Sequence, residues 1–148
     1  MRIIKETIFN DIIVLENFWP EDILADVKKI LSNYGKIYER EIEVESSGPE
    51  IKFDTQLDIV KRKDEFTVIV YTFSFHGKTN TIFQRKETIL KIVATIETQL
   101  KPMHGLIGET FMNFYQDKLD EIRKELKKEA KQTMKEIYKK INDITKKH

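Results

Sequence analysis

Residues 89–101 decide the fold of this chain, and they read Ile-Leu-Lys-Ile-Val-Ala-Thr-Ile-Glu-Thr-Gln-Leu-Lys. As a strand, this stretch would alternate an apolar face with a polar one, and from Leu90 onward only Val93 would be apolar on the polar side. The helical alternative would align four apolar residues: Ile89, Val93, Ile96 and Leu100. β-Branched residues are dense here, and they favour an extended backbone. We therefore predict a strand, with the helix as the alternative.

The sequence before this strand predicts further antiparallel strands. Residues 51–59 alternate strictly between apolar and polar side chains, which is typical of a strand with one buried and one solvated face. Residues 66–75 are apolar or aromatic on both faces, which favours a central place in the sheet. We expect a turn at residues 76–78, followed by a shorter strand around residues 79–84.

The N-terminal part predicts extended chain followed by one helix. Residues 2–16 form either a hairpin or one long strand with a bulge, and the pattern does not decide between them. Pro20 suits the first turn of a helix, where Glu21 and Asp22 complement the helix dipole. We expect this helix to end near Gly35, with the glycine in a left-handed capping conformation.

The C-terminal part predicts one long amphipathic helix over residues 105–147, with its apolar stripe facing the sheet. Gly105 and Gly108 near its start would let the backbone approach another group closely. Residues 117–148 hold 11 Lys and Arg against seven Asp and Glu, so this end is basic. We therefore divide the chain into one α+β domain at residues 1–130 and a basic extension of the helix at residues 131–148.

The composition excludes several functional classes. The length of 148 residues suits one domain with one core. The chain has no cysteine, which excludes a disulfide scaffold, a thiolate zinc site and a cysteine nucleophile. Five glycines leave no glycine-rich phosphate loop, and 26 basic against 25 acidic residues select no nucleic acid. The three histidines, His76, His104 and His148, have no metal-ligand spacing, so we predict no metal and no cofactor.

Two further features concern the cellular setting. The first seven residues carry charges and lack the apolar stretch of a signal peptide, so we expect a cytoplasmic protein. The high Lys, Glu and Ile content without cysteine is typical of a heat-adapted source.

The predicted order is a strand, a helix, an antiparallel meander and a long helix, and it resembles the START-like (SRPBCC) superfamily. The closest likeness is in residues 89–126. There an alternating strand ends at Pro102, and Gly105 and Gly108 lead into the helix, as in polyketide-cyclase-like members. Small archaeal members are similar in size and composition. The resemblance implies a helix-grip fold, a curved antiparallel β-sheet wrapped around a long C-terminal α-helix. Between them it implies a hydrophobic cavity, which many members use for lipids or other apolar ligands.

Two departures from the family pattern are visible. The family usually places two short helices after the first strand, whereas this sequence predicts one. The C-terminal helix also continues further than is needed to cover the sheet.

The inward-facing side chains of the predicted strands and helix form the candidate ligand site. They are rich in aromatic rings, and the Tyr71 and Tyr115 hydroxyls would act as polar anchors. His104, near the start of the long helix, is a candidate base or ligand anchor, or else a surface histidine. The assigned residues are Phe53, Leu57, Ile69, Tyr71, Phe73, Phe75, Ile92, Ile96, His104, Phe111, Phe114 and Tyr115. The same aromatic residues would equally suit an ordinary filled core, and both alternatives stay open.

The leading functional hypothesis is non-enzymatic binding or carrying of a hydrophobic small molecule, such as a fatty acid or another lipid. The alternative is a structural or interaction protein with a filled core that acts through its long C-terminal helix. A third hypothesis is a cyclase- or dehydratase-type enzyme with Tyr71, Tyr115 or His104 as acid or base, although no residue is assigned as catalytic. The basic helix suits a homodimer, peripheral membrane contact or a plain solvated face. It lacks the aromatic interleaving expected for nucleic acid.

Overall fold

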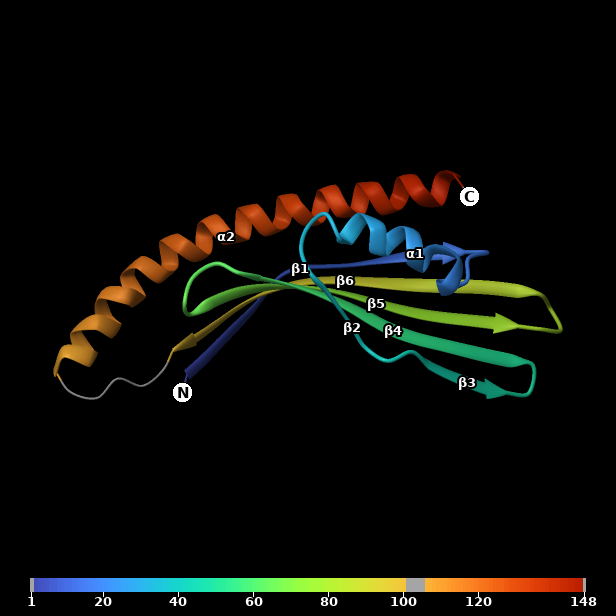
Figure 1. Ribbon diagram of the computed structural model, residues 1–148, viewed down its shortest axis with the longest axis horizontal. Helices are drawn as coiled ribbons and strands as arrows, with labels where there is room; N and C mark the ends of the chain where they lie inside the picture. The colour runs from blue at the N-terminus through green and yellow to red at the C-terminus, as the bar shows by residue number, and fades with distance from the viewer. Residues whose placement is uncertain (1, 101–105, 148) are drawn as a thin grey trace.

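The computed structural model describes residues 2–100 and 106–147. Six antiparallel strands form one curved, unclosed sheet, and two helices lie against the same face of it (Figure 1). The elements are β1 (Arg2–Glu16), α1 (Pro20–Leu31), β2 (Ile37–Glu39), β3 (Glu43–Ser47), β4 (Glu50–Arg62), β5 (Thr67–Asn80), β6 (Arg85–Leu100) and α2 (Leu106–Lys147). This is the α+β helix-grip layout expected from the sequence.

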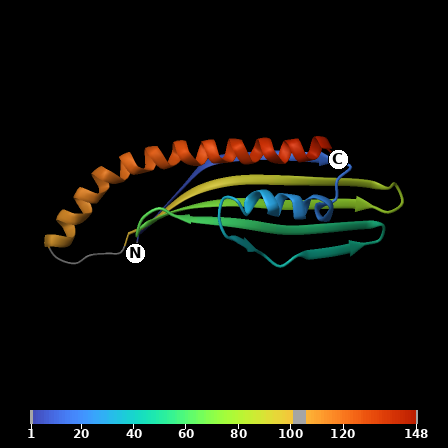
Figure 2. The same cartoon turned by 45° about the horizontal axis from the view of Figure 1, so that its top comes forward.

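The strand order across the sheet is β1-β6-β5-β4-β2, and β3 also pairs with β4. α2 runs along β1 and β6, whereas α1 lies over the middle of the sheet and contacts β5 and α2 (Figure 2). We call the face that both helices cover the inner face, and the opposite face the outer face. The hydrophobic core lies between the inner face and the two helices.

β6 confirms the strand predicted from residues 89–101, as far as Leu100. Every second side chain of this stretch is buried on the inner face: Leu90, Ile92, Ala94, Ile96 and Thr98. Val93 is half-buried on the outer face, where the alternation places it. The strand begins earlier than expected, at Arg85, because its first residues continue the ladder with β5.

β1 answers the question left open for residues 2–16. It is one long strand paired with β6 along its length, and the register shifts between Thr7 and Phe9. A bulge of this kind adds one residue to a strand and bends it locally. The bulge lies before the Asn10-Asp11 pair that separates the two apolar runs in the sequence.

The turn expected at residues 76–78 is wrong, and so is the short strand at 79–84. β5 continues to Asn80, and Gly77 pairs opposite Phe53 in the ladder with β4. Glycine is tolerated inside a strand where pairing supplies the hydrogen bonds and a large ring lies opposite. The chain turns at residues 81–84 instead, where the Asn80 Oδ1 accepts hydrogen bonds from the backbone N–H groups of Ile82 and Phe83 at 3.0 and 3.1 Å.

α1 begins as expected, with Pro20 in its first turn. The Trp19 backbone N–H donates to Asp22 Oδ2 at 3.3 Å, and the Asp22 N–H donates to the Trp19 carbonyl at 2.9 Å. The left-handed cap at Gly35 is wrong, because the helix ends at Leu31 and Gly35 has φ +159°. Gly35 is instead required by close packing, since a Cβ atom there would lie 2.9 Å from Ile59 Cγ2.

α2 confirms the single long C-terminal helix. Its buried residues continue at helical spacing almost to the end of the chain: Leu126, Ala130, Met134, Ile137 and Ile141. Within the stretch assigned as a basic extension of the helix, Met134, Ile137 and Ile141 are 0–1% exposed. The apolar stripe has no break near residue 130, so the same face of the helix keeps packing on the sheet and α1.

Candidate functional site

The inner face brings together all the strand residues that the sequence assigned to a ligand site. Eight of them come from the three central strands β4, β5 and β6: Phe53, Leu57, Ile69, Tyr71, Phe73, Phe75, Ile92 and Ile96. Their shared orientation follows from the alternation of the strands and from the antiparallel register, in which Leu57 lies opposite Phe73 and Phe73 opposite Ile92. The expectation that the assigned β4 residues Phe53 and Leu57 face inward together with the β5 aromatic residues is confirmed.

The structure does not describe the remaining four side chains of the predicted site. Phe111, Phe114 and Tyr115 belong to α2, but their side chains are not among those described, and His104 lies outside the described residues. These four assignments therefore stay predictions.

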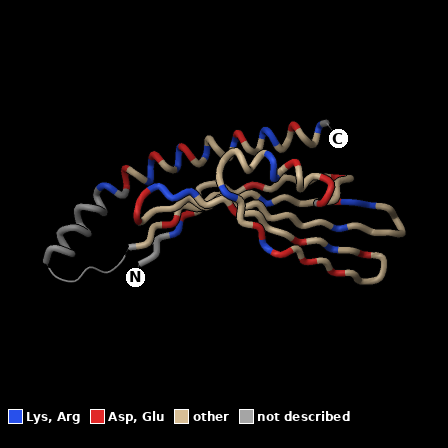
Figure 3. Tube along the Cα trace, in the orientation of Figure 1, with Lys and Arg blue, Asp and Glu red and all other residues tan. Residues whose placement is uncertain are grey.

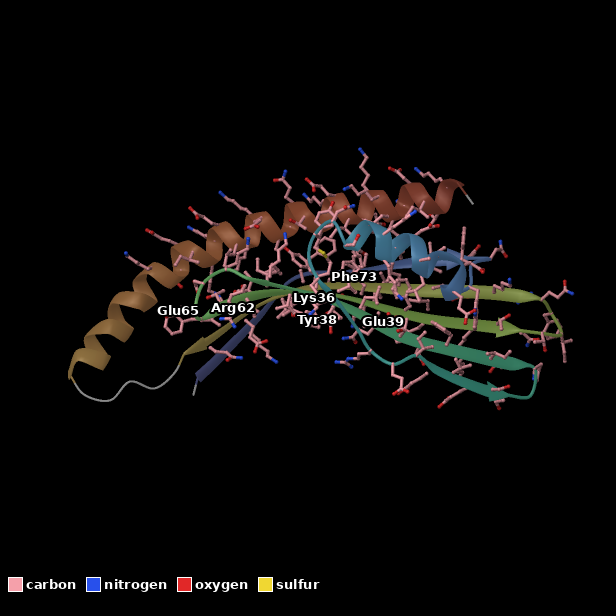
Figure 4. The ribbon with its side chains drawn as sticks, viewed as in Figure 1. Lys36, Tyr38, Glu39, Arg62, Glu65 and Phe73 are labelled. Atoms are coloured by element: carbon pink, nitrogen blue, oxygen red, sulfur yellow. The ribbon has the colours of Figure 1, made fainter. Side chains whose placement is uncertain are left out.

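The described strand residues of the predicted site are closely covered. Each of the eight has 0% exposed surface, so no water-sized space reaches them in this conformation. Figure 4 shows Phe73 beneath the helices, with Arg62 at the end of β4 and Glu65 on the connection to β5. A ligand on this wall would have to displace a covering element, and α2 is the one that runs along the sheet.

Tyr71 is the one side chain of the inner face whose polar atom is buried without a partner among the described residues. Thr133 of α2 lies close enough to the phenol oxygen to influence its pKa, and Glu129 is a further polar neighbour. No partner among the described residues lies within hydrogen-bond distance of that oxygen. Burial raises the pKa of Tyr71 above its ordinary value, and the Glu129 charge acts in the same direction while Thr133 opposes it. A buried hydroxyl without a partner costs about 1–3 kcal/mol. Tyr71 is therefore a protonated hydrogen-bond donor inside an apolar wall.

Charged side chains surround the position of Tyr71. Lys61 Nζ lies 6.0 Å from the centroid of the Tyr71 ring, within the range of a weak cation–π contact. Lys63 Nζ lies 2.5 Å from Glu129 Oε1 and so connects the end of β4 to α2 above the phenol. The hydroxyl thus lies at the border between the apolar wall and a rim of two lysines and one carboxylate.

A second polar group lies under α2 and was missed by the sequence analysis. Arg123 has a side chain that is only 9% exposed, and its Nη1 donates to Thr98 Oγ1 at 3.0 Å. Its Nη2 donates to Glu6 Oε2 at 3.1 Å, and Thr98 Oγ1 lies 3.3 Å from Thr67 Oγ1. Lys127 Nζ is 2.5 Å from the other oxygen of Glu6. We call these five residues the Arg123 cluster.

The Arg123 cluster fastens α2 to β1, β5 and β6. The pKa of Glu6 is lowered, chiefly by the hydrogen bond from Lys127, with Arg123 acting in the same direction against partial burial. The signal in the sequence was the position of Arg123, which lies on the apolar stripe three residues before Leu126. A charged residue in such a stripe indicates a buried partner.

The outer face carries a depression of about 160 Å³ lined by Arg40, Glu41, Glu43, Asp54, Thr55, Gln56, Ser74 and His76. His76 Nδ1 lies 2.5 Å from Asp54 Oδ1, and both side chains are about half exposed, at 56% and 48%. The idea that His76 lies in a turn is wrong, because it is inside β5. The expectation that residues 51–59 have one solvated face is confirmed at Asp54, which is half exposed, and Glu43 on β3 is exposed beside it. In the part of the chain that the structure describes, no group of three His, Asp or Glu side chains is placed to hold a metal ion.

Comparisons with known proteins do not identify a family for this chain. No family model matches the chain, and no curated protein matches it. Neither described helix has a stretch that is both long and apolar enough to cross a membrane.

Proposed function

We propose that this protein binds a hydrophobic small molecule with one acidic head group, such as a fatty acid, between the inner face and α2. The observation that carries the proposal is the buried Tyr71 hydroxyl without a hydrogen-bond partner among the described residues. Buried polar groups are almost always satisfied in proteins, so an unsatisfied one indicates a missing partner. A ligand head group would supply that partner.

The surroundings of Tyr71 favour an apolar ligand with a negative head. The ring lies in a continuous apolar wall, with Ile59 and Ala94 as its neighbours in register, which suits a hydrocarbon tail. Lys61 and Lys63 lie at the rim of this apolar wall. The carboxylate of a ligand could replace the Glu129 carboxylate as the ion-pair partner of Lys63. The helix-grip layout also supports the resemblance of the chain to the START-like superfamily. Many members of that superfamily use the space between sheet and helix for apolar ligands.

Binding requires α2 to move, because the described wall has no exposed surface. The Arg123 cluster would hold one part of α2 on the sheet while the part near Glu129 and Thr133 moves away from Tyr71. The ion pair of Lys63 with Glu129 is the contact that such a movement breaks first. Both of its side chains are partly exposed, so this contact is weak enough to open.

A binding role fits Tyr71 better than a catalytic one. Its pKa lies above the ordinary value of a tyrosine, so the hydroxyl stays protonated near neutral pH and is a poor general base. The alternative role through the long helix has less support. Among the side chains described in residues 118–146, the exposed ones are polar or charged and offer no apolar seam to a second helix. The homodimer therefore stays a prediction.

Tyr71→Phe tests the proposal through two readouts with opposite signs. Removing the unsatisfied hydroxyl should leave the ligand-free protein as stable as wild type or more stable. The same change should weaken binding of a fatty acid about tenfold, because the hydrogen bond to the head group is lost. Tyr38→Phe is the matched control, since Tyr38 is 50% exposed on β2 and away from the inner face.

Binding would be measured by displacement of fluorescent parinaric acid with saturated fatty acids of increasing chain length. Native mass spectrometry of the purified protein would detect a lipid that co-purifies. The proposal is wrong if parinaric acid does not bind and no lipid co-purifies. It is also wrong if Tyr71→Phe lowers stability without changing affinity, because the hydroxyl would then serve only the fold.

A further inference from the structure

The turn between β5 and β6 presents two large apolar side chains to solvent. Ile82 is 70% exposed and Phe83 is 71% exposed, more than any other large hydrophobic residue among those described. They are adjacent, and they lie at the tip of the hairpin that reaches the far end of the molecule (Figure 1). Single exposed apolar residues are common, but an adjacent pair at an extremity indicates a contact site.

The turn holds these two side chains outward by hydrogen bonds. Asn80 Oδ1 accepts from the backbone N–H groups of both Ile82 and Phe83. The Thr81 backbone N–H donates to the Pro49 carbonyl at 3.0 Å, which fastens the turn to the neighbouring β3–β4 hairpin. Thr79 Oγ1 donates to the carbonyl of Arg85 at 3.0 Å across the base of the turn. These hydrogen bonds fix the conformation of the turn, so the tip does not have to become ordered when it contacts a partner.

The charges nearest the tip on the same hairpin are basic. Arg85 and Lys86 follow the turn directly, and Lys78 precedes it, whereas Glu87 lies opposite Lys78 in the ladder. Figure 3 shows the basic start of β6 adjoining the uncharged turn. Arg85 and Lys86 follow Phe83 by two and three residues, and Arg85 lines the same surface depression as Phe83. Cations this close behind an apolar tip suit the lipid head groups that lie above the acyl chains.

We propose that the β5–β6 turn inserts Ile82 and Phe83 into the surface of an anionic lipid bilayer. The cations behind the turn contact the phosphates and carboxylates of the head groups, and Glu50 on β4 and Glu87 on β6 are carboxylates near the tip, of which Glu87 lies opposite Lys78. Two side chains are too few for a specific protein interface, which buries about 800 Å² on each partner. A bilayer needs no complementary shape, so a small apolar tip with flanking cations suits it. This inference stands whether or not the proposed ligand is bound.

Vesicle co-sedimentation tests the inference on the full chain. Wild type should bind vesicles of phosphatidylcholine mixed with phosphatidylserine, and bind pure phosphatidylcholine more weakly. The double variant Ile82→Ser with Phe83→Ser should lose about tenfold or more in binding to both kinds of vesicle. Ile12→Ser with Val14→Ser is the matched control, because these residues are 54% and 55% exposed on β1, and its binding should equal that of wild type.

Two further measurements separate the contributions of the apolar and charged residues. Arg85→Gln with Lys86→Gln should reduce binding to the anionic vesicles and leave binding to pure phosphatidylcholine unchanged. Phe83→Trp, made together with Trp19→Phe, should shift its fluorescence to shorter wavelength when vesicles are added, and this readout does not require the serine variant to fold. Absence of vesicle binding by wild type overturns the inference, as does unchanged binding by the serine variant. Loss of self-association in that variant, without vesicle binding by wild type, would assign the tip to a second copy of the chain instead.

Discussion

Neutralising Glu6 should cost this protein more stability than neutralising an ordinary surface carboxylate. The change Glu6→Gln removes the charge that faces Arg123 and Lys127 and keeps the size of the side chain. It leaves the Arg123 guanidinium, with a side chain only 9% exposed, buried beside Thr98 without an anion. A buried charge that loses its partner is strongly destabilising.

The expected loss of stability follows from how far the Arg123 and Glu6 side chains are exposed. Breaking a fully buried ion pair costs about 3–5 kcal/mol. Glu6 is 40% exposed, and its Gln replacement still accepts a hydrogen bond, so we expect a loss of about 1–2 kcal/mol. For a chain of this length that loss lowers the melting temperature by about 2–8 °C. Arg123→Met should cost less, because it removes the buried charge and leaves Glu6 paired with Lys127.

Urea unfolding at pH 7 measures these differences, with Glu39→Gln as the control. Glu39 forms a surface ion pair with Lys28 at 2.8 Å, and both side chains are more than a third exposed. Such a pair contributes about 0–1 kcal/mol. Equal losses in Glu6→Gln and Glu39→Gln would refute the reasoning.

The pH dependence gives a second check on the same pair. The folded pKa of Glu6 is lowered below its ordinary value, so its contribution to stability is present above the unfolded pKa. That contribution is lost as the pH falls through the folded pKa, because the carboxylate is then protonated in both states. The difference between wild type and Glu6→Gln should therefore shrink toward zero in acid. A difference that stays constant from pH 7 into acid would mean that the charge of Glu6 is not responsible.

Two further predictions concern packing. Gly35→Ala should lose about 1–3 kcal/mol in urea unfolding, because the new Cβ would lie 2.9 Å from the buried Ile59. Gly48→Ala, at φ +58° with open space around it, should lose only the backbone cost of about 1 kcal/mol, and the reverse order would contradict the close approach. Met134→Ala should lose about 2–5 kcal/mol, whereas the exposed Lys131→Ala should lose less than about 0.5 kcal/mol. Similar losses in the two would show that this end of α2 is not part of the core.

The periodic parts of this fold could be predicted because burial on one face imposes a period on the sequence. The period of two in residues 90–98 and the helical stripe from Leu126 to Ile141 both correspond to buried faces in the structure. The same alternation placed the aromatic residues of β4 and β5 together. It could not tell whether their interior is closed, because burial of an apolar face looks alike in a filled core and in a cavity wall.

The features that were missed depend on contacts between distant parts of the chain. Gly77 resembled a turn residue, but pairing with Phe53 keeps it inside a strand. Arg123 and Glu6 are 117 residues apart, so no local pattern connects them. The contact of Met134, Ile137 and Ile141 with the sheet and α1 likewise joins parts of the chain that are distant in the sequence.

The order of the elements also affects how the protein folds during synthesis, because α2 follows every strand of the sheet. The sheet needs β6 before β1 can pair, and its aromatic inner face is then complete but not yet covered by α2. The nascent chain therefore exposes this face until Met134, Ile137 and Ile141 have been translated. Such exposed apolar surface favours aggregation and chaperone binding. A chain truncated near residue 125 should be retained by chaperones, whereas a chain that includes residues 126–141 should bury the same surface.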